Sequence, residues 1–134
     1  MNPPEIRLEG HRVRVGCDVV ALDEIANSLA SFGDRYLAKI YTADEVATCD
    51  GPNLVARLAA RFAAKEAAMK AFACPDAAFV PLEIEVVTSD YLPRLRLSGS
   101  AAQLAAEQQW QEVSLSLTHA DCHAAAVVVA VCAG

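Results

Sequence analysis

The chain has 134 residues, of which 54% are hydrophobic, and a formal net charge of −6 at pH 7. This length is typical of one domain, residues 1–134, with a core of its own. The acidic balance argues against a general nucleic-acid binder, and no apolar run is long enough to span a bilayer. The five cysteines are an odd number without a C-x-x-C pair, which argues against a disulfide framework and a zinc site. We therefore expect a cytoplasmic protein whose thiols are mostly buried and structural.

The first half of the sequence predicts one strand followed by helices. A β-branched run indicates the strand, and apolar residues at helical spacing indicate the helix after it. Asp34 is a candidate N-cap, and Thr42 and Glu45 form a capping box, in which each side chain accepts a hydrogen bond from the backbone of the other. The predicted elements are a loose or edge lead-in (1–11), a strand (13–20), a helix (21–32) and two short helices (34–40 and 43–50).

The second half predicts a long helix and then two pairs of strands around a further helix. Asn53 can cap the long helix, and Cys74 ends it because the residue before a proline is pushed out of the helical region. Ser100 is the candidate cap of the last helix. The order of strand, helices, hairpin, helix and hairpin predicts an α+β fold. The predicted elements are the long helix (54–73), alternating strands (82–88 and 93–97), a helix (100–109) and two final strands (113–118 and 124–131).

The long helix carries a regular set of charges. Arg57, Arg61 and Lys65 follow one another at four-residue steps, and Glu66 and Lys70 form a second such pair. In one interpretation the set is a solvated helix face with ion pairs between successive turns. In the other, Glu66 holds a metal ion while the cations bind phosphate oxygens, because the planar fork of arginine and the point charge of lysine both suit phosphates.

Asp18 follows the apolar run of the first strand. From spacing alone, Asp18 is interpreted as an acidic residue at a strand end, near the N-terminus of the next helix. In the alternative interpretation it is a second metal ligand, since Mg²⁺ takes hard oxygen ligands and is often held by one or two carboxylates plus substrate phosphates. Asp18 and Glu66 lie far apart in the sequence, so only the fold can bring them together.

Two histidines, His119 and His123, frame the polar loop between the last two strands. As a zinc pair they lack an evident third ligand. We expect His123 to be a loop histidine that is hydrogen-bonded to the backbone. For His119, the alternative to such a backbone hydrogen bond is a contact with a phosphate group.

Three segments carry a family resemblance. Residues 16–20 (GCDVV) are similar to a G-x-D-[IV]-V strand, residues 61–72 (RFAAKEAAMKAF) to an R-F-A-A-K-E-A-x-x-K-A-[FL] helix, and residues 114–119 (SLSLTH) to a V-S-[IL]-[ST]-H strand end. Together they resemble the holo-acyl-carrier-protein synthase family, the small trimeric 4′-phosphopantetheinyl transferases. The resemblance covers roughly residues 13–131, and the helix motif is its most specific part.

The resemblance implies a 4′-phosphopantetheinyl transferase-like fold, in which an antiparallel sheet packs against a long helix and several short helices. It also implies a Mg²⁺-dependent enzyme that transfers 4′-phosphopantetheine from coenzyme A to a serine of an apo carrier protein, with adenosine 3′,5′-bisphosphate as the leaving product. By this resemblance, Asp18 and Glu66 would ligate Mg²⁺, and Glu66 would also be the catalytic base. Lys70 would contact the diphosphate, and Arg61 and Lys65 would help to hold the phosphates. His119 would reach the nucleotide phosphates from the neighbouring subunit.

The same resemblance implies a homotrimer with sites at its subunit interfaces, acting on a carrier of a fatty-acid, polyketide or other secondary pathway. A related two-lobed class has an extra acidic ligand where this chain has Val20, so the trimeric type is favoured. The sequence departs from the family at several places, two of which bear most on function. The Gly-rich loop after the long helix is replaced by residues 73–77 (ACPDA), and the first helix carries Asp23 and Glu24 where many members are basic. The alternative function is therefore a degenerate member that binds a carrier or coenzyme A without catalysis.

Overall fold

The computed structural model describes residues 4–134, so residues 1–3 of the predicted lead-in lie outside the described residues. The strands are β1 (Glu5–Leu8), β2 (His11–Ala21), β3 (Ile84–Ser89), β4 (Leu92–Leu97), β5 (Trp110–His119) and β6 (His123–Ala133). The helices are α1 (Leu22–Phe32), α2 (Asp34–Ile40), α3 (Ala43–Cys49), α4 (Leu54–Phe72), α5 (Gly99–Glu107) and the single 3-10 turn η1 (Pro81–Glu83).

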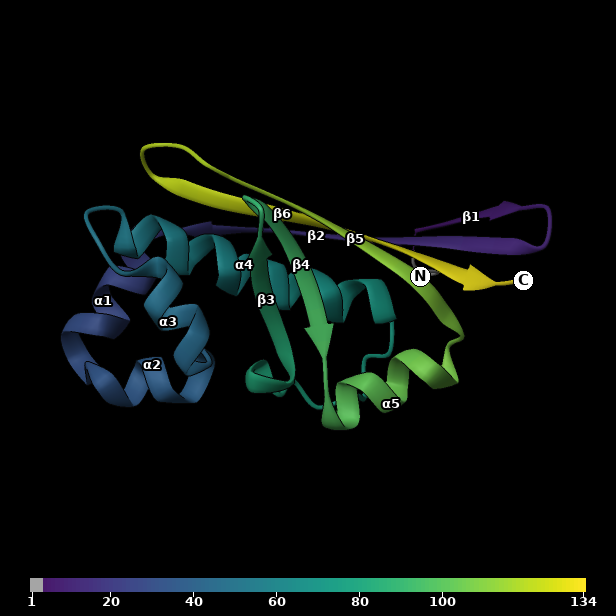
Figure 1. The fold of residues 1–134 in the computed structure, drawn as a ribbon, viewed down its shortest axis with the longest axis horizontal. Coiled ribbons are helices and arrows are strands. Elements are labelled where there is room, and N and C mark those ends of the chain that lie inside the picture. The colour runs from purple at the N-terminus through teal and green to yellow at the C-terminus, as the bar shows by residue number, and fades with distance from the viewer. Residues whose placement is uncertain (1–3) are drawn as a thin grey trace.

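One antiparallel sheet, with strand order β1-β2-β6-β5, forms one layer of the molecule. The long helix α4 lies directly beneath it, and the other described helices lie on that same side (Figure 1). A separate antiparallel hairpin, β3–β4, packs against α4 and β5. These features confirm the predicted α+β fold class, with an antiparallel sheet on a long helix and several short ones.

The capping box at the start of α3 is confirmed, whereas two other caps were assigned to the wrong residue. The Thr42 hydroxyl accepts from the Glu45 backbone at 3.2 Å, and a Glu45 carboxylate oxygen accepts from the Thr42 backbone at 3.0 Å. The N-cap position of α2 is Gly33, not Asp34. Ser98 holds the N-cap position of α5, because the predicted cap, Ser100, donates its hydroxyl to Glu83 instead.

Close packing between α4 and β2 brings the two halves of the candidate site together. The buried surface of α4 consists largely of alanines, which let the helix approach the sheet closely. At Gly16 the approach is backbone to backbone: a Cβ there would overlap the Ala67 carbonyl and lie 2.7 Å from the Ala71 nitrogen. Asp18 follows two residues later on the same face of β2, so it points towards α4.

The opposite face of the sheet has no helix over it in the described part of the chain (Figure 1). Successive strand residues point to opposite faces, so the odd-numbered residues of β2 and β6 form this outer face. It includes Val19, which is 61% exposed, and its apolar neighbour Val127, which is 39% exposed. An apolar sheet face open to solvent is typical of an interaction surface.

All five cysteines are free thiols, and their burial differs from the expectation. Cys49 and Cys132 are buried, Cys74 is half-buried, and Cys17 and Cys122 are exposed. The prediction of mostly buried thiols is therefore wrong. Within residues 4–134, no helix combines the length and the apolar character needed to cross a membrane.

Candidate active site

Asp18, Glu66 and Lys70 meet where β2 crosses α4. The Lys70 ammonium donates to a carboxylate oxygen of Asp18 and to the Cys17 backbone carbonyl, both at 3.0 Å. Glu66 lies one helical turn before Lys70, so both side chains project from the same face of α4. The Lys70 side chain is still 56% exposed, which leaves its ammonium accessible to a ligand.

The charges around Glu66 favour the binding of a cation. Partial burial raises the pKa of Glu66, and the negative charge of Asp18 raises it further, while Lys70 lowers it and Glu24 adds a small increase. Two carboxylates that repel each other in a half-buried place are stabilised when a cation lies between them. The site therefore has the electrostatics of a cation site.

Magnesium fits this pair of side chains. Both offer hard carboxylate oxygens, which are the donors that Mg²⁺ prefers. Within residues 4–134, no group of three or more histidine, cysteine, aspartate or glutamate side chains is arranged so that it could hold a metal ion by itself. Asp18 and Glu66 are thus a partial ligand set, of the kind that Mg²⁺ accepts when substrate phosphates and waters supply the other positions.

A groove of about 750 Å³ opens beside these residues. Its polar end is formed by Glu66 and Lys70. Its walls are mostly apolar and come from β2, the end of α4 and the loop that follows; they include Val15, Gly16, Met69, Ala73, Cys74 and Phe79. A groove with an anion-binding end and apolar walls suits a ligand that has a phosphate group and an apolar part.

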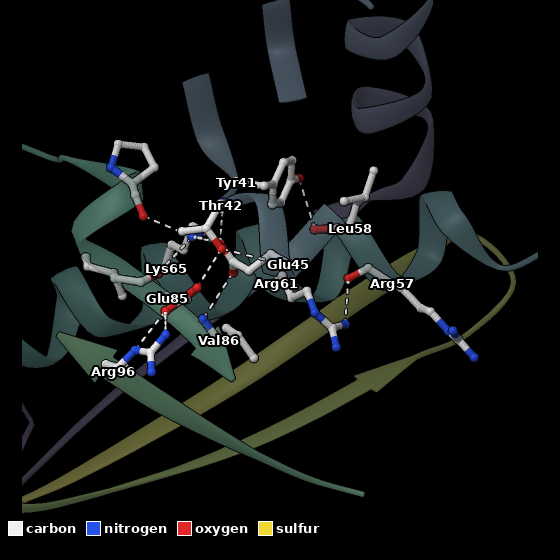
Figure 2. Close-up of polar contacts among 12 residues, drawn as sticks. Tyr41, Thr42, Glu45, Arg57, Leu58, Arg61, Lys65, Glu85, Val86 and Arg96 are labelled. Carbon is white, nitrogen blue, oxygen red and sulfur yellow. Dashed lines mark hydrogen bonds and ion pairs between the residues drawn. The ribbon is translucent and has the colours of Figure 1, made fainter. Parts of the chain in front are cut away.

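Lys65 lies elsewhere, inside the protein. Its side chain is 0% exposed, and its ammonium donates to Glu45 at 2.8 Å, to the Pro81 carbonyl at 2.9 Å and to the Ile84 carbonyl at 2.8 Å (Figure 2). An ammonium has three N–H donors, so none remains for a phosphate. This corrects the expectation that Lys65 binds phosphate oxygens. The reason is that adjacent residues on a helix point about 100° apart, so Lys65 leaves α4 on a different side from Glu66.

Arg61 and His119 also lie apart from the three site residues. Arg61 is 7% exposed and donates to the Arg57 carbonyl and to the Thr88 hydroxyl, each at 3.2 Å, while its Nε has no partner within the described residues. His119 is exposed at the end of β5 and faces Ala124 of β6, which in turn pairs with Val20 of β2. His119 is therefore at the same end of the sheet as Asp18, but two strands away.

Glu45 and Glu85, two acids that bond to the residues around Lys65, were not predicted to have this role. Glu45 was assigned only to the capping box, and its second role as the buried partner of Lys65 has no separate signal in the sequence. Glu85 accepts hydrogen bonds from Thr42 at 2.6 Å and from Arg96 at 2.9 Å. The only sequence signal for Glu85 is its place in an alternating strand, and that pattern predicts an exposed side chain.

Comparison with known proteins decides the family. Residues 14–132 match the family model of the 4′-phosphopantetheinyl transferase superfamily. The chain belongs to this superfamily. It is 40% identical over 117 residues to the holo-[acyl-carrier-protein] synthase of Koribacter versatilis (strain Ellin345), an alignment that covers 85% of this chain and 94% of the relative. The synthase of Maridesulfovibrio salexigens is 37% identical over 119 residues, with 87% and 96% covered.

Solved structures of holo-acyl-carrier-protein synthases have the same fold as this superfamily member. The Chronobacterium ammoniagenes ACPS–CoA complex has a TM-score of 0.77 at 26% identity, with 91% of this chain and 98% of that chain covered. The Mycobacterium tuberculosis acyl carrier protein synthase has a TM-score of 0.70 at 31% identity, with 90% and 96% covered. Fold and sequence thus confirm the predicted family and its transferase class.

Proposed function

We propose that this chain transfers 4′-phosphopantetheine from coenzyme A to a serine hydroxyl of an apo acyl or peptidyl carrier protein and releases adenosine 3′,5′-bisphosphate. The observation that carries the proposal is the meeting of Asp18, Glu66 and Lys70 at the polar end of the groove. Coenzyme A as the co-substrate is supported by the solved synthases of Chronobacterium ammoniagenes and Helicobacter pylori, which are complexes with coenzyme A.

Asp18 and Glu66 would hold Mg²⁺ in this proposal, since a pair of carboxylates suits an ion that also binds substrate phosphates. When bound, the ion supplies polarisation of the diphosphate and offsets the charge of the leaving group. Support comes from Glu66, whose pKa is raised by partial burial and, after that, by the negative charge of Asp18.

The side chains of the site have separate roles. Lys70 fixes Asp18 through their hydrogen bond and offers its exposed ammonium to the diphosphate. Glu66 accepts the proton of the serine hydroxyl directly or through a water. The serine oxygen forms a bond to the phosphorus of the pantetheine phosphate, and the bond between that phosphorus and the bridging oxygen breaks. The bridging oxygen leaves with adenosine 3′,5′-bisphosphate.

The active form is a homotrimer with sites at its subunit interfaces. The open apolar face of the four-stranded sheet, which includes Val19 and Val127, supports such an assembly. His119 does not reach the Asp18 site of its own chain, so it contacts the nucleotide phosphates bound by a neighbouring chain. The reducing cytoplasm suits the five free thiols.

The experiment is incubation with coenzyme A, Mg²⁺ and a panel of apo carrier proteins, followed by mass spectrometry of each carrier. We expect at least one carrier to gain one phosphopantetheine group, and a chelator or Glu66→Ala to abolish the gain. Asp44→Ala, at an exposed acid on α3, is the matched control and should leave transfer unchanged. No gain on any carrier, together with no coenzyme A binding by calorimetry, would refute the proposal.

A second candidate function is binding without catalysis. Ala73, rather than glycine, takes the left-handed backbone conformation (φ 55°) where α4 ends at the groove. Close approach of a backbone to a ligand usually relies on glycine, which favours a member with weakened nucleotide binding. Asp18→Ala separates the two functions. If the wild type modifies a carrier and the Asp18→Ala variant does not, a function limited to binding is excluded.

A further inference from the structure

A buried ion pair links α3 to α4 at the residue next to Glu66. Both side chains of the Lys65–Glu45 pair are 0% exposed, and their charged atoms are 2.8 Å apart. Glu45 also accepts from the backbone nitrogens of Thr42 at 3.0 Å and Val86 at 3.1 Å. Every polar atom of the pair is therefore directed at a partner, and none points to solvent (Figure 2).

The hydrogen bonds of this pair join four separate segments of the chain. Lys65 binds the carbonyls of Pro81 in η1 and Ile84 in β3, while Glu45 binds the start of α3 and the backbone of β3. Glu85 continues the network from Thr42 to the exposed Arg96 of β4 (Figure 2). A shift of α4 along or about its axis would lengthen several of these hydrogen bonds at once.

Stability alone does not explain a buried ion pair. Removing two charges from water is costly, and well-packed hydrophobic residues of similar volume are often as stable. The pair adds a defined position for α4, because hydrogen bonds fix distance and angle. A defined position is needed here since the rest of the buried surface of α4 is mostly alanine, and small side chains interlock weakly with the neighbouring layer.

The position of α4 decides the geometry of the site. Glu66 is on α4 and Asp18 is on β2, so the distance between the two carboxylates changes with any movement of the helix. On one side the backbone contact at Gly16 limits how closely α4 approaches the sheet. On another side Lys65 fixes the rotation and axial position of the helix through three acceptors.

We propose that Lys65, held by Glu45, is a positioning residue that sets the location of Glu66 relative to Asp18, and that it makes no contact with coenzyme A. This inference rests on the proposed transferase function. It predicts that loss of the pair weakens metal binding and the catalytic step in a protein that is still folded, while the affinity for coenzyme A without metal stays close to that of the wild type.

The test uses the double variant Lys65→Met/Glu45→Gln, which removes both charges together and so avoids a single unpaired buried charge. The control is Leu58→Ala, which removes apolar core volume from the same helix without touching the network. Circular dichroism first shows that each variant is folded at the assay temperature. Transfer kinetics, calorimetry with coenzyme A in the absence of metal, and electron paramagnetic resonance of Mn²⁺ as a stand-in for Mg²⁺ are then measured.

We expect the folded double variant to lose about ten- to hundredfold in kcat, as a misplacement of about 1 Å can cause, and to bind Mn²⁺ more weakly. The control should keep wild-type values of both. Wild-type kcat and Mn²⁺ binding in the double variant would overturn the positioning role, and so would a loss confined to coenzyme A affinity, which would indicate direct phosphate contact.

Two further outcomes keep the inference falsifiable. If the double variant does not fold, Lys65→Met/Glu45→Leu replaces the whole pair by apolar side chains of similar volume; it should weaken Mn²⁺ binding in the same direction, and unchanged Mn²⁺ binding overturns the inference. If the wild type modifies no carrier, the proposed function fails. If the wild type and the double variant are equally active, only the positioning role fails.

Discussion

Two glutamates of this transferase superfamily member have pKa values that are shifted in opposite directions, and they should affect stability in opposite ways. Burial and the neighbouring charge of Asp18 raise the pKa of Glu66 above its ordinary value near 4.5. A raised pKa means that the folded state holds the proton more tightly than the unfolded state. The associated stability is present below pH 4.5 and is lost as the pH rises through the folded-state pKa.

Glu66→Gln should therefore make the protein more stable at pH 7 and inactive in transfer. The neutral amide removes the repulsion by Asp18, so we expect the melting temperature at pH 7 to rise by about 2–4 °C. The difference from the wild type should vanish near pH 4, where the wild-type carboxylate is protonated. Thermal unfolding at the two pH values measures it, and an equal rise at both would show that charge is not the cause.

Glu85 has the opposite shift. The hydrogen bond from Thr42 is the main cause that lowers the pKa of Glu85; burial opposes it, and the hydrogen bond and charge of Arg96 lower the pKa further. The stability that comes from this carboxylate is present above pH 4.5 and is lost as the pH falls through the lowered pKa.

Glu85→Gln should cost about 1.5 kcal/mol in the free energy of unfolding at pH 7, the usual contribution of a hydrogen bond to a charged group. The cost should shrink in acid, as the wild-type carboxylate takes up a proton. Urea unfolding at pH 7 and pH 3.5 compares the two proteins. A cost that is the same at both pH values would contradict the assigned role of the carboxylate charge.

At the scale of helices and strands, one glycine controls the contact that forms the site. Gly16→Ala would place a Cβ against the backbone of α4, at Ala67 and Ala71, and backbone atoms cannot move aside as a flexible side chain can. Overpacking of this kind costs about 1–3 kcal/mol or more. Because α4 must move away from β2, we also expect Mn²⁺ binding and transfer to fall.

Urea unfolding and Mn²⁺ titration measure both effects of Gly16→Ala. Gly10→Ala is the control: the glycine has φ +73° but open space around it, so alanine there costs only backbone strain of about 1–2 kcal/mol and should leave Mn²⁺ binding unchanged. A Gly16→Ala protein with wild-type metal affinity would show that the contact between α4 and β2 does not set the site.

Periodicity was enough to predict most elements of this fold, because helices and strands bury one face at a regular spacing. The same periodicity could not say which layer covers each face of α4. Lys65 and Lys70 look equivalent in the sequence, yet one is buried against α3 and β3 and the other is exposed beside Asp18. The prediction of Ser100 as a cap failed for a related reason, since its hydroxyl donates to Glu83, a residue distant in the sequence.

For the whole molecule, the open sheet face predicts assembly. Apolar side chains such as Val127 on β6 lie on the face that carries no helix in the described part of the chain, and their burial against other copies would contribute about 25 cal/mol for each Å² removed from water. Assembly into the proposed trimer would bury this face, so analytical ultracentrifugation of the wild type should give the mass of three chains.

Val127→Glu should convert the trimer to single chains, because a carboxylate buried in an apolar interface is strongly disfavoured. If His119 serves the site of a neighbouring chain, transfer should be lost together with the trimer, although the Asp18–Lys70 hydrogen bond lies within one chain. Ala106→Glu, at an exposed position on α5, is the control and should leave both mass and activity unchanged. A fully active single-chain Val127→Glu protein would place the whole site within one chain.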